Sequence, residues 1–192
     1  MKKEACREQE CLTTEYLIEA QQGNSDALSA LAHRVHARLF RFCLWLTGNR
    51  AQAEDLYQDA FVKVMEHLHE IDTPTHFISW LYKVTKNQFL DYVRSAPHRK
   101  TVSIENIRPL EFTPPGQSEL IYQLGYAFRQ ISAEQRYLFL LVYLEEHSYQ
   151  EAGEILGISE DAVRLRLFKI RRVFRKDFFA TESKLCLSPR RD

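Results

Sequence analysis

The chain has 192 residues, of which 45% are hydrophobic and 27% are charged, which is enough for one medium domain or two small ones. Its 26 basic residues balance its 26 acidic residues, so the formal net charge is zero. The charged beginning MKKEACREQE is unlike a secretory signal, and no apolar run approaches the length of a membrane span. The four cysteines lack Cys-x-x-Cys spacing and fit a reducing compartment, so we expect a soluble, cytoplasmic protein without direct membrane insertion.

The distribution of charge carries more information than its sum. Six acids and only one base, Lys63, fall between Glu54 and Asp72, whereas every charged residue from Arg164 to Lys176 is basic. An acidic face in the first half and a basic face near the end predict two different partners.

The first half of the chain is expected to form four helices after a disordered N-terminal tail at residues 1–13. Gly23 ends the first helix, Ser25 caps the second, and Thr47-Gly48-Asn49 ends the second. Pro74 is expected to fix a loop at residues 70–75 before the fourth helix. The expected helices cover residues 14–22, 25–46, 51–68 and 77–94.

The third and fourth of these helices carry apolar residues at helical spacing. In the third, the residues expected to face inward are Tyr57, Phe61, Val64 and Leu68. In the fourth, the residues expected to face inward are Phe77, Leu81, Val84 and Leu90, and those expected to face outward are Lys83, Lys86 and Arg94.

Helical periodicity fails between residues 98 and 117, where Pro109, Pro114 and Pro115 stiffen the chain. Because Pro-rich segments extend, this stretch is predicted to be a flexible linker, with a weak indication of a strand at Thr101–Ile104. Further helices are expected at residues 118–128 and 133–145, and a polar tail at residues 180–192. The predicted fold class is all-α, with two small helical domains at residues 14–97 and 118–179.

The stretch from Tyr149 to Phe174 has the pattern of a helix-turn-helix. A short helix ends at Gly157, where a left-handed cap favours glycine, and Ser159 caps a second helix. Gly153 supplies a small residue where the two helices cross. The second helix is basic outside one apolar face, as suits the DNA major groove, and that apolar face is Val163, Leu167, Ile170 and Phe174.

A basic amphipathic helix alone is more often a solvated surface or a membrane-surface helix. Here the preceding helix, the glycine turn and the serine cap together favour the helix-turn-helix.

Three motifs in this order resemble the bacterial sigma-70 family: AEDLYQDAF from Ala53, WLYKVTKNQFLDYVR from Trp80, and the helix-turn-helix. LFRFCLWLTGN from Leu39 fits the same family, and the resemblance covers roughly residues 14–178. The short linker resembles the extracytoplasmic-function (ECF) group. Gly153 departs from the family's usual alanine, and Ala162 and Leu165 stand where it usually has Thr and Ser.

The resemblance implies that the first domain, region 2, binds the β′ clamp helices of core RNA polymerase and melts the −10 element of promoter DNA. The second domain, region 4, is implied to bind the β flap and the −35 element. An anti-sigma factor is a further implied partner. Such a protein directs catalysis by polymerase, and we expect no enzymatic activity, no catalytic residue, no cofactor and no metal.

The acids of residues 51–68 allow two explanations besides a solvated surface. As a metal site they lack a histidine or further acid at ligand spacing, whereas docking on a basic helical partner agrees with the resemblance. The residues expected to bind core polymerase are Glu54, Asp55, Gln58, Asp59 and Phe61.

Basic and aromatic side chains occur near one another on the fourth helix, as in proteins that capture single-stranded DNA. Phe77, Trp80 and Tyr82 are candidates for stacking, although the hydrophobic core is the better explanation for Trp80. The loop at residues 71–76 is expected to form the wall of a pocket for a flipped −10 base. The residues expected to bind the −10 element are Asp72, Thr73, His76, Lys83, Lys86, Asn87, Arg94 and Arg99.

The outward face of the recognition helix is expected to read the −35 element. Leu165 lies about 200° around the helix from buried Val163, so it is predicted to face DNA and to contact a thymine methyl group. The residues expected to bind the −35 element are Ser159, Glu160, Asp161, Arg164, Leu165, Arg166, Lys169 and Arg171.

We therefore expect an ECF-type sigma factor. The alternatives are a stand-alone helix-turn-helix regulator, which has no use for an acidic docking helix, and a metal-dependent nuclease built on the carboxylates.

Overall fold

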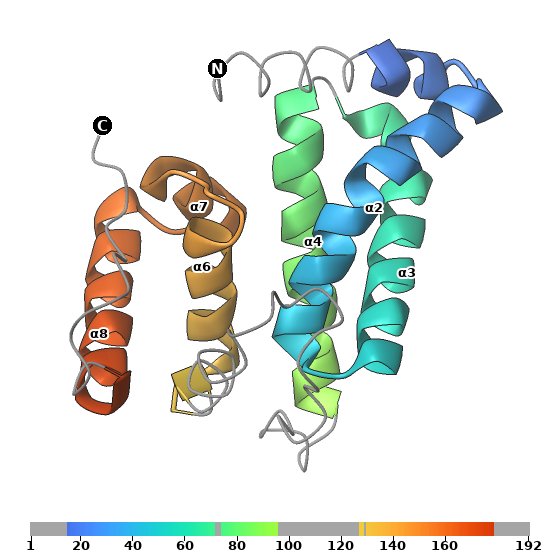
Figure 1. Ribbon diagram of the computed structural model, residues 1–192. Helices are drawn as coiled ribbons and strands as arrows, with labels where there is room; N and C mark the ends of the chain where they lie inside the picture. The colour runs from blue at the N-terminus through green and yellow to red at the C-terminus, as the bar shows by residue number, and fades with distance from the viewer. Residues whose placement is uncertain (1–14, 72–73, 96–126, 129, 179–192) are drawn as a thin grey trace, which may run out of the picture.

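The computed structural model describes residues 15–71, 74–95, 127–128 and 130–178 (Figure 1). All regular structure in these ranges is helical, which confirms the predicted all-α fold class. The expected tails, the linker, its weak strand and nearly all of the helix expected at residues 118–128 lie outside the described residues.

The first lobe contains the helical turns of residues 15–21 and the helices α2 (Ser25–Thr47), α3 (Arg50–Glu66) and α4 (Pro74–Ser95). The helix α2 is capped by Asn24, whose side chain accepts from the N–H groups of Asp26 and Ala27, so the expectation that Ser25 is the cap is wrong by one residue. The helix ends at Gly48, which has a φ of 68° and donates its N–H to Leu44.

Helix α3 buries only part of the expected stripe: Val64 and, just after the helix, Leu68 are buried as expected. Tyr57 and Phe61 are only half-buried, and their stacked rings lie 5.8 Å apart. The small side chains of the buried alanines in α3 let the helix lie close against α2 and α4 instead. A short 3₁₀ helix at Leu68–Glu70 follows where α3 was expected to continue. The buried residues of α3 are Ala53, Leu56, Ala60 and Val64.

Helix α4 begins at Pro74 and not at Phe77, because proline at the first helical position loses no intrahelical hydrogen bond. Phe77 and Leu81 are buried as expected, whereas Val84 and Leu90 are only half-buried. The core positions that periodicity missed are Tyr82, Thr85 and Phe89.

The second lobe contains α6 (Ala133–Tyr143), α7 (Tyr149–Leu156) and α8 (Glu160–Phe178). Capping boxes start the first two helices, Ser132 with Gln135 and Ser148 with Glu151. Helix α6 ends two residues earlier than expected. Glu146 follows with a φ of 58°, a left-handed conformation that ends the helix.

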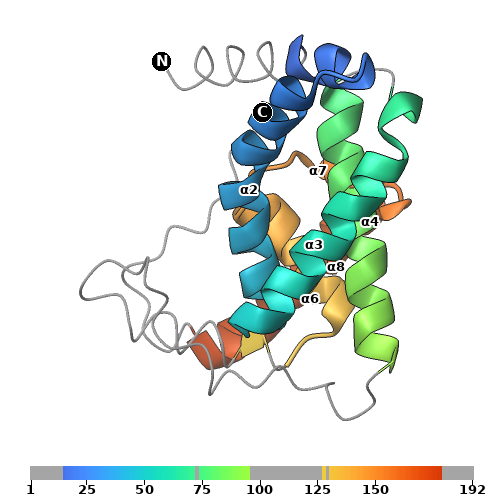
Figure 2. The same cartoon turned by 90° about the vertical axis from the view of Figure 1, so that its right-hand side faces the viewer.

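The two lobes pack against each other, with α6 and α7 against α2 and α4 (Figure 1). A view turned by 90° has α3 in front and α6 and α8 behind it (Figure 2). Phe42 of α2 meets the rings of Tyr82 and Tyr137 edge-on at 5.1 Å each, so the two lobes share one aromatic core. The helices α3 and α8 therefore lie on opposite sides of the molecule.

Candidate protein-binding and nucleic-acid interfaces

The outward side of α3 carries an exposed acidic face, which we define as Glu54, Asp55, Gln58, Asp59 and Val62. Glu54 pairs with Arg50 at 3.1 Å within the helix, whereas Asp55 and Asp59 have no ion pair with another described residue. Val62 is 55% exposed and follows these polar side chains at the C-terminal end of the face. Apolar and charged side chains occur together on protein-binding surfaces.

Phe61 is less exposed than the rest of the polymerase-binding set, and its neighbour Val62 is more exposed. Phe61 was expected in the polymerase-binding set, but it is half-buried against Tyr57. Val62 was not singled out, although it lies seven residues after Asp55 and three after Asp59, on the same helix face. No three His, Cys, Asp or Glu residues gather at metal-binding distance within the described part of the chain.

Helix α4 presents Lys83, Asn87 and Arg94, all exposed, on one side. Their spacing of four and seven residues places them in a row along the helix. Arg94 is paired with Asp91 at 3.1 Å, and both side chains are open to solvent. These three residues form the part of the expected −10 surface that the structure brings together.

Lys86 does not lie in this row. It is half-buried, and its Nζ donates to the backbone oxygen of Leu156 in α7 at 3.5 Å. Burial lowers the pKa of Lys86, as does the nearby charge of Lys83. The expectation that Lys86 faces outward is therefore wrong in this arrangement of the lobes.

The other residues expected at the −10 surface fall into two groups. The structure corrects the role of some of them and does not describe the others. Phe77 and Tyr82 are buried in the core, so the stacking role suggested for them is wrong. Trp80 is half-buried beside the ring of His67. Outside the described residues, or with undescribed side chains, are Asp72, Thr73, His76 and Arg99.

The turn between α7 and α8 depends on two glycines with different tasks. Gly157 has a φ of 70°, and its N–H donates to the oxygen of Gly153. Gly153 has an ordinary helical conformation, but a Cβ there would lie 2.7 Å from the oxygen of Ile158. The sequence indicated a small residue at Gly153, and the structure narrows this to glycine, because the backbone of the turn leaves no room for a Cβ.

The outward side of α8 is basic, and we define this basic face as Arg164, Leu165, Arg166, Phe168, Lys169 and Arg172. Leu165 is 55% exposed, as expected, and Phe168 is 61% exposed. Phe168 was not expected in the reading surface. The sequence could have indicated that Phe168 is exposed. It lies five residues after Val163, which is about 140° around the helix from that buried residue, and on the same side as Leu165.

Two acids at the start of α8 hold Arg164 in place. Its guanidinium lies 2.7 Å from Glu160 and 3.4 Å from Asp161, and the Ser159 hydroxyl accepts from the N–H of Ala162 at 3.3 Å. The first turn therefore holds an arginine at the N-terminal end of α8, the end that was expected to contact DNA bases.

Arg171 differs from the other basic residues of α8. Its Nε donates to the hydroxyl of Tyr143 and its Nη2 to that of Tyr149 at 2.7 Å, and the side chain is half-buried. Arg171 thus joins α8 to α6 and α7. Arg172 and Lys169 are the exposed alternatives for the phosphate contact expected of it.

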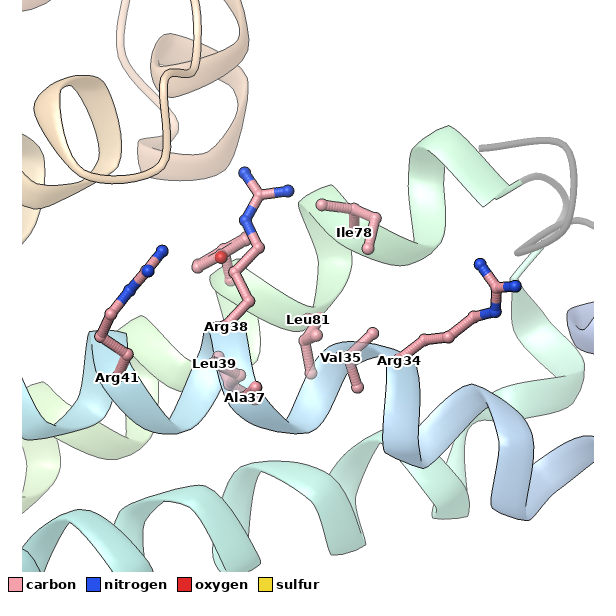
Figure 3. Close-up of a pocket in the computed structure, with 9 residues that line it drawn as sticks. Arg34, Val35, Ala37, Arg38, Leu39, Arg41, Ile78 and Leu81 are labelled. Atoms are coloured by element: carbon pink, nitrogen blue, oxygen red, sulfur yellow. The ribbon is translucent and has the colours of Figure 1, made fainter. Parts of the chain in front are cut away.

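A third charged surface lies in a cleft of about 360 Å³ between α2 and α4. Arg34, Arg38 and Arg41 project from α2 along its edge, above the apolar side chains of Leu81 and Val35 (Figure 3). Sequence periodicity did not single out these arginines. The described part of the chain contains no helix long and apolar enough to cross a membrane.

Comparison with known proteins identifies the two lobes. The family model of Sigma-70 region 2 matches residues 31–99, and that of Sigma-70, region 4 matches residues 121–173. The chain is 33% identical over 138 residues to the ECF RNA polymerase sigma factor SigM of Bacillus subtilis, covering 70% of this chain and 84% of SigM. It is 33% identical over 153 residues to the ECF sigma factor SigL of Mycobacterium tuberculosis, covering 77% of this chain and 86% of SigL.

Two solved structures share the fold. CnrH in complex with the cytosolic domain of CnrY gives a TM-score of 0.66 at 21% identity, covering 87% of this chain and 97% of CnrH. The sigma factor RpoE of Bartonella quintana, in complex with the anti-sigma factor NepR, gives a TM-score of 0.64 at 20% identity. This match covers 81% of this chain and 98% of the other chain. Together with the region 2 and region 4 matches and the curated relatives, these findings show that the chain belongs to the ECF group of the sigma-70 family.

Proposed function

We propose that this sigma factor binds core RNA polymerase through the acidic face of α3 and directs it to promoters through α4 and α8. The observation that carries the proposal is the pair of exposed faces of opposite charge on opposite sides of one molecule. A stand-alone regulator needs only the basic one. The protein itself catalyses no reaction, since it belongs to a family of transcription initiation factors.

The acidic face suits the β′ clamp helices as its partner. Asp55 and Asp59 are exposed and unpaired among the described residues, so a basic partner gains charge complementarity without first breaking an ion pair. Val62 supplies an apolar contact at the C-terminal end of this face. Glu54, Gln58 and the edge of Phe61 complete the surface that we assign to core polymerase.

The row on α4 suits one separated strand of the −10 element. Lys83 and Arg94 supply charges for phosphates, and Asn87 between them supplies an amide for a base edge. The neighbouring Asp72, Thr73 and His76, with Arg99 after the helix, complete this surface in the proposal. Lys86 joins it once α7 moves away.

The basic face of α8 suits the major groove of the −35 element. Leu165 and Phe168 are large exposed apolar side chains among basic side chains. Their exposure to water is unfavourable unless a partner covers them. Thymine methyl groups are the apolar feature of the major groove. Arg164 and Arg166 are placed for guanine edges, and Lys169 and Arg172 for phosphates.

Two further partners follow from the family. The β flap is the expected polymerase contact of region 4. An anti-sigma factor is an expected regulator, in line with the RpoE neighbour that was solved with NepR. Because it acts on core polymerase, the protein works in the cytoplasm.

Run-off transcription with purified core polymerase over a promoter library tests this function. Transcripts from a defined −10 and −35 pair are expected only when the protein is added. Specific binding to duplex DNA without polymerase, and no transcript with it, would favour the stand-alone regulator.

A further inference from the structure

We propose that Gln21 is a positioning residue for recognition of the −10 element, because its side chain fixes the backbone at the corner between α3 and α4. We define this α3–α4 corner as residues 67–71, which contain the short 3₁₀ helix Leu68–Glu70. The helical turns that carry Gln21, residues 15–21, precede the region 2 match, which begins at residue 31. The effect on promoters rests on the proposed function, whereas the contact itself is a property of the free chain.

The half-buried amide of Gln21 donates two hydrogen bonds to this corner. Its Nε2 donates to the backbone oxygen of Leu68 at 2.9 Å and to that of Ile71 at 2.8 Å, although they lie 47 and 50 positions away in the sequence. An amide nitrogen of glutamine has two protons, so both are used. The oxygen of Leu68 also accepts from the N–H of Ile71 at 3.4 Å. One side chain from a distant part of the chain therefore holds both ends of a four-residue turn, whose carbonyl groups would otherwise lack part of their hydrogen bonding.

The helical turns that carry Gln21 end in a fixed geometry. The N–H of Asn24 donates to the oxygen of Glu19 at 3.1 Å, and the N–H of Gly23 donates to that of Ala20 at 3.0 Å. With a φ of 89° at Gly23, this pair of bonds is the Schellman motif. Asn24 also caps α2, so the turns are joined to that helix without a flexible connection. Gln21 therefore extends from a rigid support.

Buried apolar side chains flank the contact on both elements. Leu17 and Ala20 of the turns are 1% and 6% exposed, and Leu68 and Ile71 of the corner are each 5% exposed. The turns and the corner lie at the same end of the first lobe (Figure 2). Apolar burial is not directional, whereas hydrogen bonds have a preferred length and angle. The apolar side chains thus hold the two elements in the core, and the amide of Gln21 fixes where the backbone of the corner lies.

The α3–α4 corner lies between the two surfaces of the first lobe that the proposed function uses. The acidic face of α3 precedes it, and the row on α4 follows it. In the sequence, Ile71 leads directly into Asp72 and Thr73, which the proposed function assigns to the −10 element. The hydrogen bond to the oxygen of Ile71 sets the point from which the chain continues to them. Because binding groups need placement to within about 0.5 Å, loss of this bond should impair base selection before it impairs the fold.

Hydrogen exchange in the free, full-length protein tests the contact. Gln21→Met keeps a long unbranched side chain but has no N–H to donate. Gln22→Met makes the same replacement one position later, at an exposed side chain, and is the matched control. We expect the amides of residues 67–71 to exchange roughly tenfold faster in Gln21→Met, because two hydrogen bonds are lost, and at an unchanged rate in Gln22→Met. Equal rates in the two variants overturn the contact.

Transcription with core polymerase tests the role in recognition. Promoters that differ only in their −10 bases are transcribed with the unsubstituted protein and with each variant. Gln21→Met is expected to lower the yield from the preferred −10 sequence roughly tenfold and the yields from weaker sequences less, so that the preference narrows. A purely structural loss would lower all yields by one factor and keep their ratios. Polymerase affinity in a pull-down should not change, because the acidic face of α3 is intact.

The two measurements separate the contact from its role. Faster exchange together with unchanged ratios among the −10 sequences overturns the positioning role. No transcript from the unsubstituted protein overturns the proposed function and with it this role, whereas the exchange rates still report on the contact. If Gln21→Met fails to fold by circular dichroism, Gln21→Asn decides by the same criteria, because its amide is one methylene too short to reach both oxygens.

Discussion

Helices α3 and α8 are built alike and differ in the sign of their outward charge. Each buries one stripe of its surface and exposes a large apolar side chain on the other side, Val62 in α3 and Leu165 in α8. The polar side chains around Val62 are mostly acidic, whereas those around Leu165 are mostly basic. We propose that a different partner covers each face and that the surrounding charge selects it, a basic partner for α3 and DNA for α8.

The comparison also explains how a chain of zero net charge binds DNA. The acidic face of α3 lies on the far side of the molecule from the basic face of α8. Charges separated by more than about 10 Å are largely screened at ordinary salt concentrations, so α3 does not weaken DNA binding by α8.

Reversing the charge of the α3 face should have the largest effect. Asp55→Lys with Asp59→Lys places like charges against a basic partner, and we expect core polymerase affinity to fall at least roughly tenfold. The free energy of unfolding should change little, because both side chains are exposed. Glu15→Lys with Glu154→Lys makes the same change in net charge elsewhere and should retain binding. Equal affinities of the two double variants in a pull-down would remove α3 from the docking surface.

The α8 face depends on the close approach of Gly153 in α7 to the backbone of the turn that precedes α8. Gly153→Ala should lower the free energy of unfolding by about 1–3 kcal/mol, because the new Cβ overlaps the oxygen of Ile158, although alanine favours helices. Gly157→Ala meets no atom within 4 Å and should cost only about 1–2 kcal/mol, for its left-handed backbone. Urea unfolding measures both. A more stable Gly153→Ala protein would contradict the crossing.

Within the α8 face, apolar and basic residues should differ in what they determine. Leu165→Ser and Phe168→Ala should each change the preferred base at one −35 position, since a lost base contact costs about 1–3 kcal/mol. Arg172→Ala should weaken binding to all sequences and reduce the salt dependence. Arg171→Ala, whose guanidinium bonds two tyrosines, should lower stability first. Binding-site selection that returns the original −35 preference for Leu165→Ser would exclude that residue.

The smallest effect is expected at the corner that joins the lobes. Burial lowers the pKa of His147, and the charge of Arg38 does so further, against the opposing influence of Glu151 and Glu145. The unfolded chain then binds a proton near pH 6.5, whereas the folded chain binds it only at lower pH. Stability should therefore fall as the pH decreases through this window and be independent of this residue above it.

Urea titrations at pH 7.5 and pH 5.5 on the protein and on His147→Gln check this prediction. The variant should lose less stability between the two values. An identical loss would show that His147 does not contribute to the pH dependence.

Local signals in the sequence were sufficient for most helices and for the helix-turn-helix. Periodicity, caps and glycine breaks act over a few residues, so Gly157 and Ser159 could be placed without a structure. The expected stripe of α3 was wrong at Tyr57 and Phe61, because large residues were given more weight than small ones, whereas Ala53 and Ala60 let the helices approach.

Contacts between distant residues could not be predicted in this way. Nothing near Glu145 in the sequence shows that Arg38 and Tyr82 bury it, and nothing near Arg171 indicates its two tyrosine partners. The exposed Val62 and Phe168 were within reach of sequence reasoning, because each departs from the apolar stripe of its own helix.

We propose that one molecule uses α3 for polymerase and α8 for promoter DNA at the same time. Photo-crosslinking tests it directly, with p-benzoylphenylalanine at the position of Asp59 in one protein and of Phe168 in another. In complexes with core polymerase and promoter, the first is predicted to crosslink only to the β′ subunit and the second only to DNA near position −35. Crosslinks from both positions to DNA, or a DNA crosslink at Phe168 that is equally strong without polymerase, would contradict the account.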